Sequence, residues 1–261
     1  MLMVISPAKT LDFETPSPTK TNTQPNFLGE AQELVDVLKG YTPSRLAKLM
    51  KLSDKLAGLN TARYQEWQPP FDSENAKQAL LAFKGDVYTG INADEFKRPQ
   101  FTYVQKHLRI LSGLYGLLRP LDLIQPYRLE MGTALKNPQG KDLYQFWGSK
   151  ITDELNANLK KMKGKAVLVN LASNEYFKSV KPKDLNCRVV TPVFKDEKAG
   201  KFKVISFFAK KARGLMVAYA AYNNITQVEA LKDFDWDGYQ YNAAMSEADN
   251  WVFTRAENWA E

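Results

Sequence analysis

The chain has 261 residues, of which 44% are hydrophobic and 25% are charged, and its formal net charge is +7. This length and apolar content predict a single folded domain over residues 1–261, and the lack of an apolar run of about 18 residues argues against a membrane span. One cysteine and one histidine exclude a disulfide framework and zinc sites of the usual spacing, and the first ten residues do not resemble a signal peptide. We therefore expect a cytoplasmic protein, and no pattern calls for a metal or cofactor.

The first hundred residues are expected to be rich in helix. The apolar run at 1–6 ends at a proline, which is typical of a strand, and a proline-rich surface loop follows at 14–26. Thr42 and Pro43 suit the N-cap and first turn of a helix. Helices are predicted at 27–39, 43–51 and 72–83, with irregular segments or a brief strand at 52–58 and 83–90 that expose Lys55 and Lys84.

The segment from His107 to Gly132 is the most informative part of the chain. Apolar residues at helical spacing over 100–111 predict a helix, which ends in a glycine-rich turn at 112–116. Exposed N–H groups in such a turn suit a phosphate oxygen, and Arg119 and Arg128 would add donors. The pattern resembles the helix-hairpin-helix class of DNA-binding element, although its tip, from Gly113 to Gly116, is one residue longer than usual.

The alternative for this segment is a helical turn buried in the core. In that case Arg119 would pair with Asp122, and Arg128 with Glu130. The local sequence does not decide between the two interpretations.

The second half of the chain favours a mixed sheet with flanking helices. An antiparallel hairpin is indicated where two alternating runs flank a polar turn, and no linker separates independent domains. The fold class is therefore mixed α/β (α+β). The expected elements are a helix at 151–162, a strand at 165–171, hairpin strands at 188–195 and 202–208, a helix at 209–222, and strands at 238–242 and 251–255.

Two loops that follow strands are candidates for chemistry. If the strands at 1–6 and 165–171 are parallel neighbours, the loops after them meet at one edge of the sheet. Lys9 and Glu175 would then converge, placing a nucleophile or phosphate binder beside an acid or base. The alternative is that Ser6, Asn170 and Ser173 only cap these strand ends.

The positive charge is concentrated in one part of the chain. Fifteen Lys or Arg and four acidic residues lie from Lys160 to Arg213, whereas two basic and eight acidic residues follow Thr226. This asymmetry suits a polyanionic partner, and the alternative is a set of solvated lysines. Tyrosines and a phenylalanine near the cations suit stacking on unpaired bases, or else simple packing. These aromatic residues are Tyr88, Tyr115, Tyr127, Tyr176 and Phe177.

Over nearly its whole length the chain resembles the YaaA family of bacterial peroxide-stress proteins. The match is poorest after Trp236, and nothing is carried over there. The matching motifs are ISPAKTL at 5–11, SDKLAG at 53–58, FKGDVY at 83–88, residues 111–131, NLAS at 170–173, EYFK at 175–178 and AKKARG at 209–214.

The resemblance implies a single-domain fold of unusual topology that contains a helix-hairpin-helix element. It implies a positively charged cleft that binds duplex and distorted or single-stranded DNA independently of sequence, a role in hydrogen peroxide stress, and a link to limiting iron-dependent DNA damage. The candidate DNA-binding residues are Lys9, Lys55, Lys84, Gly113, Tyr115, Gly116, Arg119, Arg128, Lys178, Lys181, Lys210, Lys211 and Arg213.

Two other functions stay open from the sequence. One is an enzyme that acts on a nucleobase, nucleotide or damaged DNA, with Lys9 and Glu175 in its pocket and with an unknown small-molecule ligand. The other is an iron-binding stress protein, for which the acidic residues form no organised ligand set.

Overall fold

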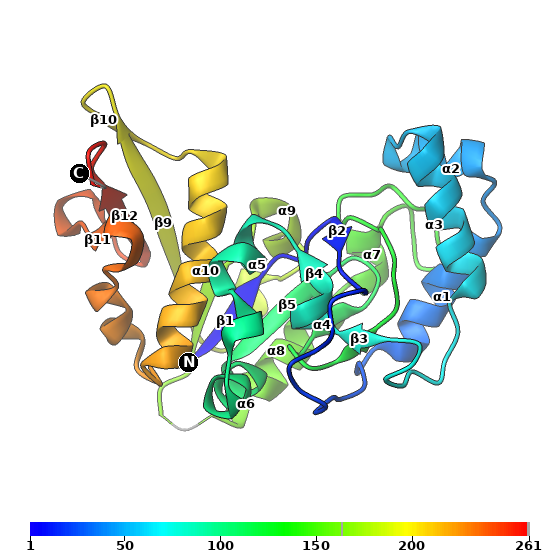
Figure 1. The fold of residues 1–261 in the computed structure, drawn as a ribbon, viewed down its shortest axis with the longest axis horizontal. Helices are drawn as coiled ribbons and strands as arrows, with labels where there is room; N and C mark the ends of the chain where they lie inside the picture. The colour runs from blue at the N-terminus through cyan, green and yellow to red at the C-terminus, as the bar shows by residue number, and fades with distance from the viewer. Residues whose placement is uncertain (163, 260–261) are drawn as a thin grey trace.

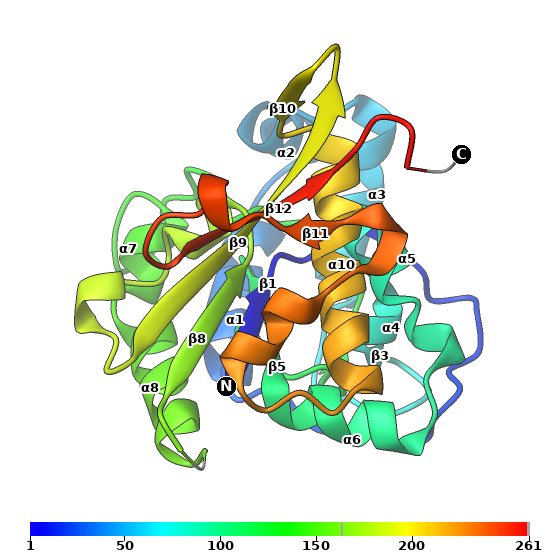
Figure 2. The same ribbon diagram turned by 90° about the vertical axis from the view of Figure 1, so that its left-hand side faces the viewer.

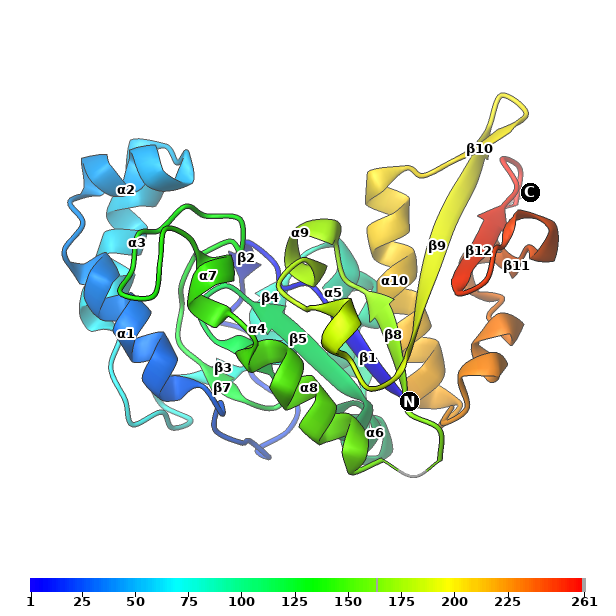
Figure 3. The same cartoon turned by 180° about the vertical axis from the view of Figure 1, so that it is seen from behind.

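A computed structural model describes residues 1–162 and 164–259, and it confirms the mixed α/β class. The central sheet has the strand order β11-β12-β9-β8-β1-β5-β6, with β10 paired to β9 (Figure 1). Helices α5, α6 and α10 cover one face of this sheet and α8 covers the other (Figures 1 and 3). The strands of this sheet are β1 (Leu2–Ile5), β5 (Leu108–Ser112), β6 (Gly116–Leu118), β8 (Val167–Leu171), β9 (Arg188–Lys198), β10 (Lys201–Lys203), β11 (Gln240–Tyr241) and β12 (Asn250–Arg255).

Strand β1 lies where the strand order reverses. All four of its residues are buried, and it pairs in parallel with β5 on one side and with β8 on the other. After β1 the chain leads to β5 on one side, whereas after the neighbouring strand β8 it leads to β9 on the other side. In open α/β sheets, ligand sites form outside the carboxyl ends of the strands at such a switch point. We therefore expect a ligand site at the loops after Ile5, Ser112 and Leu171.

The helices between β1 and β5 match the predictions only in part. Helices α1 (Leu28–Lys39) and α2 (Pro43–Met50) confirm two of them, and Thr42 Oγ1 caps α2 by accepting from the Arg45 N–H at 3.3 Å. Helix α3 (Asp54–Glu66) replaces the irregular segment that was expected around Lys55. These three helices stand together at one end of the molecule (Figure 1).

The helix predicted at 72–83 is wrong. This stretch contains strand β3 (Lys77–Gln78), the single turn α4 (Ala79–Ala82) and the start of β4 (Phe83–Lys84). Strand β3 pairs with β7 (Leu123–Ile124), and β4 pairs with β2 (Thr10–Leu11). Partners distant in sequence therefore override the local preference for a helix. The chain continues through α5 (Asp86–Ile91), η1 (Ala93–Glu95) and α6 (Arg98–His107).

The expected helix-hairpin-helix is also wrong, because the segment forms a β-hairpin. Helix α6 ends at His107, and β5 and β6 then pair antiparallel around the turn at 113–115. Every residue of both strands is buried, which explains the nearly continuous apolar run from Leu108 to Leu118. A strand buried on both faces has no alternating pattern, so its apolar residues also fit helical spacing.

The second half follows the expected order. Helix α8 (Lys150–Lys160), strand β8, the antiparallel β9–β10 hairpin, helix α10 (Ser206–Tyr222), β11 and β12 confirm the predictions, except that residues 204–208 lie outside β10. Figure 2 shows the end of β9 with β10 extending past the other strands. The remaining elements are α7 (Leu143–Trp147), α9 (Asn174–Phe177), η2 (Pro182–Asp184), η3 (Val228–Asp233), η4 (Trp236–Gly238) and η5 (Ala243–Met245). Among the described helices, none has the length and apolar character needed to cross a bilayer.

Candidate functional site at the carboxyl edge of the sheet

The loops after β1 and β8 meet, as the sequence predicted. The Ser173 N–H donates to Ser6 Oγ at 2.9 Å, and the two hydroxyl oxygens are 3.3 Å apart. The Tyr88 hydroxyl donates to the Ser6 carbonyl oxygen at 3.1 Å from α5. Because β1 and β8 are parallel neighbours, these polar groups lie together at the carboxyl edge of the sheet.

Lys9 and Glu175 both reach the segment 130–132, but they contact different groups there. Lys9 Nζ lies 3.3 Å from Glu130 Oε1, whereas Glu175 Oε1 accepts from the Gly132 N–H at 2.9 Å. Glu130 Oε1 also lies 3.2 Å from Arg128 Nη2. Glu130 Oε2 is buried and has no hydrogen-bond partner among the described residues. The sequence suggested Glu130 only as a partner for Arg128, so its contact with Lys9 is a finding of the structure.

Further cations lie next to this cluster. Lys84 Nζ is 3.1 Å from Asp12 Oδ2, and Lys210 Nζ is 3.8 Å from Asp86 Oδ2. A methyl group added at Gly85, between Lys84 and Asp86, would lie 3.3 Å from Ala8 Cβ, so the β4–α5 junction lies close to the loop after β1. These contacts join α10, the β4–α5 junction and the loop after β1 into one surface.

The same surface continues to α9. The Tyr144 hydroxyl donates to the Glu175 carbonyl oxygen at 2.9 Å, and Lys178 Nζ lies 4.9 Å from the centre of the Tyr144 ring. Figure 1 shows this edge of the sheet between α10 on one side and α1–α3 on the other. We call its basic side chains the carboxyl-edge band, which consists of Lys9, Lys84, Arg128, Lys178 and Lys210.

The lysines of the band lie outside their acidic partners. The Lys9 and Lys84 side chains are each 66% exposed, whereas those of Glu130 and Asp12 are 17% and 16% exposed. The Asp12 carboxylate accepts from the N–H and the hydroxyl of Thr15 and from Lys84, and these hydrogen bonds hold its pKa well below the usual range. Both carboxylates lie beneath the ammonium groups, so a ligand approaching the edge meets positive charge first.

Other predicted cations lie outside the band. Arg119 follows β6, which runs antiparallel to β5 toward the opposite edge, and its Nη2 lies 2.9 Å from Asp122 Oδ1. Lys211 pairs with Asp237 at 3.3 Å. Arg213 is half-buried, and burial lowers the pKa of its guanidinium. Lys55, in the first turn of α3, and Lys181, after α9, are exposed. The prediction of one group containing all these cations is therefore wrong.

The glycine tip and the tyrosines named from sequence are buried. Gly113, Tyr115 and Gly116 have no appreciable exposure, and the Tyr115 hydroxyl accepts from Trp67 Nε1 at 2.9 Å. The alternative of a buried turn is thus confirmed in its burial and in both of its ion pairs, but the turn belongs to a β-hairpin and is not helical. The other three tyrosines are also in the core and Phe177 is half-buried, because these rings pack the helices on the sheet. The buried tyrosines are Tyr88, Tyr127 and Tyr176.

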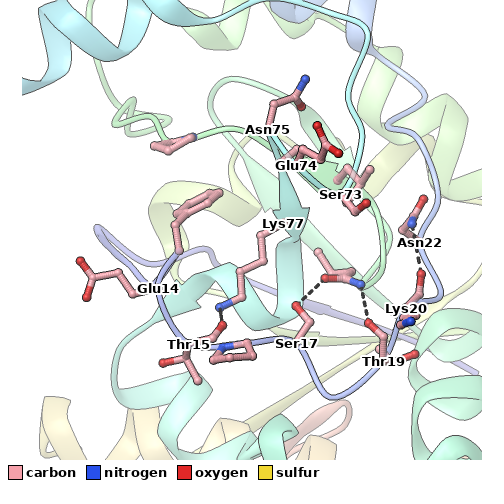
Figure 4. A pocket seen from close by; sticks show the side chains of 16 residues that line it. Glu14, Thr15, Ser17, Thr19, Lys20, Asn22, Ser73, Glu74, Asn75 and Lys77 are labelled. Carbon is pink, nitrogen blue, oxygen red and sulfur yellow. Dashed lines mark hydrogen bonds between the residues drawn. The ribbon is translucent and has the colours of Figure 1, made fainter.

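A separate pocket of about 600 Å³ lies beside β3 (Figure 4). Its buried cation, Lys77, donates to the carbonyl oxygens of Asp12 and Thr15 at 2.9 and 2.7 Å. Gln78 donates to the carbonyl oxygens of Thr19 and Thr21 at 2.9 and 3.1 Å. Lys77 and Gln78 therefore hold the loop at 12–21 in place.

A metal centre has no support in the part of the chain that the structure describes. There, no three His, Cys, Asp or Glu side chains are grouped so that they could hold an ion.

A family model and several relatives match nearly the whole chain. The model of the family described as "Peroxide stress protein YaaA" matches residues 1–245. Two UPF0246 proteins, from Teredinibacter turnerae and Saccharophagus degradans, are 59% and 60% identical over 257 residues, which is 98% of this chain and 100% of theirs. A third, from Colwellia psychrerythraea, is 58% identical over 258 residues, with 99% and 100% covered. The chain therefore belongs to the YaaA family of peroxide stress proteins.

Proposed function

We propose that this peroxide stress protein binds DNA independently of sequence, through the phosphates, on the carboxyl-edge band. The observation that supports this proposal is the arrangement of exposed lysines from separate segments above less exposed carboxylates. In the Lys210–Asp86 pair, as in the other two, the lysine is the more exposed partner, at 52% against 32%. Such an outer layer of ammonium groups attracts a polyanion, while the acids beneath fix where the lysines stand.

The ion pairs of the band do not prevent this binding. Exposed ion pairs contribute about 0–1 kcal/mol because water and salt screen them, so a phosphate can compete for the lysines at little cost. The gain comes from counterions released from the DNA, which supplies most of the free energy of non-specific binding. Because the contacts are to phosphates, affinity should be similar for different base sequences.

A titration of labelled 20-base-pair duplexes at several salt concentrations tests this proposal. Each lost phosphate contact should lower affinity about eightfold at 0.1 M salt and reduce the salt slope by about 0.9. We expect Lys84→Gln to cause this loss for every sequence. The matched control is Lys106→Gln on α6, which makes the same charge change near the start of β1. Equal losses in both variants, or a complex that is insensitive to salt, would contradict the proposal.

The same binding offers a route to limiting iron-dependent damage. Cationic side chains that neutralise phosphates release the cations held by the DNA, and Fe²⁺ is among the cations that phosphates can hold. Covered DNA should therefore suffer fewer breaks from Fe²⁺ and H₂O₂. Plasmid nicking with and without protein measures this effect, and the Lys84→Gln protein should protect less than the Lys106→Gln protein. Equal protection by both variants would show that the carboxyl-edge band does not limit iron-dependent DNA damage.

A second function, catalysis on a nucleobase, nucleotide or damaged strand, is favoured by one observation. Glu130 Oε2 is buried beside Lys9 and has no hydrogen-bond partner in the part of the chain that the structure describes; a buried acceptor left unpaired costs about 1–3 kcal/mol. Such a cost is tolerated more often at functional sites than elsewhere.

Abasic, nicked and bubble DNA provide the substrates for a test of this second function. The Lys9 amine would condense with the aldehyde of an abasic site to give an imine and water, and borohydride would reduce the imine to a stable amine. A cross-link lost in Lys9→Gln but kept in Lys106→Gln supports catalysis. The absence of both a cross-link and an altered strand would refute catalysis and leave DNA binding as the proposed function.

A further inference from the structure

Exposed phenylalanines lie in a part of the chain where the sequence singled out no aromatic residue. Phe207, in the first turn of α10, is 57% exposed, and Phe202 on β10 is 36% exposed. Both belong to the stretch 201–208, which continues from the β9–β10 hairpin into α10. Figure 2 shows that this hairpin extends beyond the rest of the sheet.

Three lysines share one face of the hairpin. Lys198 is directly opposite Lys201, and Lys203 is opposite Asp196, so the side chains of Lys198, Lys201 and Lys203 point to the same side. None of the three forms an ion pair with any residue of 1–162 or 164–259. Like charges directly across an antiparallel pair are destabilising, and the opposed lysines at this hairpin are therefore suited to a bridging anion.

A chain of side-chain contacts links Phe207 to the strand that carries Lys198. Asp196, on the same side as the lysines, binds Arg255 at 2.7 Å, and the Arg255 guanidinium lies 4.6 Å from the centre of the Phe208 ring. Phe208 is in turn 5.6 Å from Phe207, centre to centre. Phe202 points to the opposite side of the hairpin, because it pairs with Glu197. The buried Arg255 thus holds the start of α10 against β9, on the side of the hairpin to which the three lysines point.

We propose that this surface, formed by Lys198, Lys201, Lys203 and Phe207, binds unpaired DNA bases and the phosphates between them. This inference rests on the proposed function and adds the form of DNA that the protein prefers. A phenylalanine ring stacks only on a base whose face is free, so it recognises single strands and bubbles rather than closed duplex. The surface is continuous with the carboxyl-edge band, since Lys210 lies one helical turn beyond Phe207. A strand leaving a duplex on the band would reach Phe207.

Phe207→Ala and Phe202→Ala form the matched pair for the test. Fluorescence anisotropy with a 20-nucleotide thymine oligomer, a bubble and a closed duplex measures binding. We expect Phe207→Ala to weaken the oligomer and bubble complexes about 5- to 150-fold and to leave the duplex unchanged. Phe202→Ala should bind all three as the native protein does. Both rings are exposed, and an unchanged urea midpoint would show that each variant is folded.

A triple variant tests the lysines. Changing Lys198, Lys201 and Lys203 to Gln should reduce the salt slope for the oligomer by about two units. An unchanged slope, or equal effects of the two phenylalanine variants, would overturn the inference. So would binding to phosphatidylglycerol vesicles that depends on Phe207 without binding to the oligomer, since that result would assign the surface to lipid.

The outcomes separate this inference from the proposed function. Duplex binding that depends on Lys84 but a bubble complex that is insensitive to Phe207 would refute only the inference. Oligomer binding that depends on Phe207, with no duplex complex, would refute only the proposal for the band.

Discussion

The glycine turn between β5 and β6 provides a sharp test of the fold. Gly116 has a φ of +65°, and a methyl group added there would lie 2.6–2.9 Å from the buried ring of Trp147. A left-handed backbone costs a non-glycine residue about 1–2 kcal/mol, and overpacking costs about 1–3 kcal/mol. We therefore expect Gly116→Ala to reduce the free energy of unfolding by about 2–5 kcal/mol, a large part of the ~5–15 kcal/mol typical of a domain.

Gly113→Ala tests the same turn by a different contact. Its methyl group would lie 2.2 Å from the carbonyl oxygen of Leu129, which belongs to the segment that carries Arg128 and Glu130. Backbone atoms in the core cannot move aside cheaply, so this variant should also be destabilised. It should in addition disturb the carboxyl edge, because that segment leads directly to Glu130.

Urea unfolding followed by tryptophan fluorescence measures both effects. Gly58→Ala in α3 is the control, because nothing lies within 4 Å of the added methyl group, and we expect a gain of about 0.5–1 kcal/mol from helix propensity. If Gly116→Ala were as stable as the native protein but lost DNA affinity, the turn would be an exposed phosphate-binding tip. The buried β-hairpin would then be refuted.

Two further predictions concern stability. Arg255 and Asp196 are both buried and 2.7 Å apart, so Arg255→Leu leaves an uncompensated carboxylate and should cost about 3–5 kcal/mol. Lys232→Met should cost under about 1 kcal/mol, because its partner Glu229 is 56% exposed to water, and equal urea midpoints for the two variants would contradict this. Burial lowers the pKa of His107 below its ordinary value of 6.5, while its Nδ1 lies 2.8 Å from the Met1 carbonyl oxygen. The unfolded chain therefore binds a proton that the folded chain does not, and stability should fall as pH drops below about 6.5. In His107→Asn this decrease between pH 7 and 5.5 should be smaller, and an unchanged slope would show that His107 does not cause it.

Local signals were sufficient where one face or one cap determines the element. The buried run of β8, the Thr42 cap of α2 and the alternation of β9 were all readable from sequence. Helix α3 gave a weak signal, because its buried side chains, Ala57, Asn60 and Tyr64, include only one large apolar ring. Its N-cap, Ser53 followed by Asp54, was the one clear indication of a helix.

Of the candidate site, the sequence predicted only the part that depends on the parallel pairing of β1 and β8. That pairing follows from two apolar runs, and it correctly brings the loops of Ser6 and Ser173 together. Which acid each lysine meets depends on how segments far apart in sequence pack. Lys9 and Glu130 are separated by 121 positions, and no local pattern joins them. Exposure is equally hard to predict, because Tyr176 is buried although it follows Glu175, whereas Phe202, between two lysines, is exposed.

The central claim is that the carboxyl-edge band carries the phosphate contacts. The most direct test compares the salt slope of duplex binding for two double variants, Lys9→Gln with Lys84→Gln, and Lys97→Gln with Lys106→Gln on the side of α6. We predict that the first pair reduces the magnitude of the slope by about 1.8 and that the second leaves it unchanged. A slope reduced equally by both pairs, or only by the second, would contradict the account.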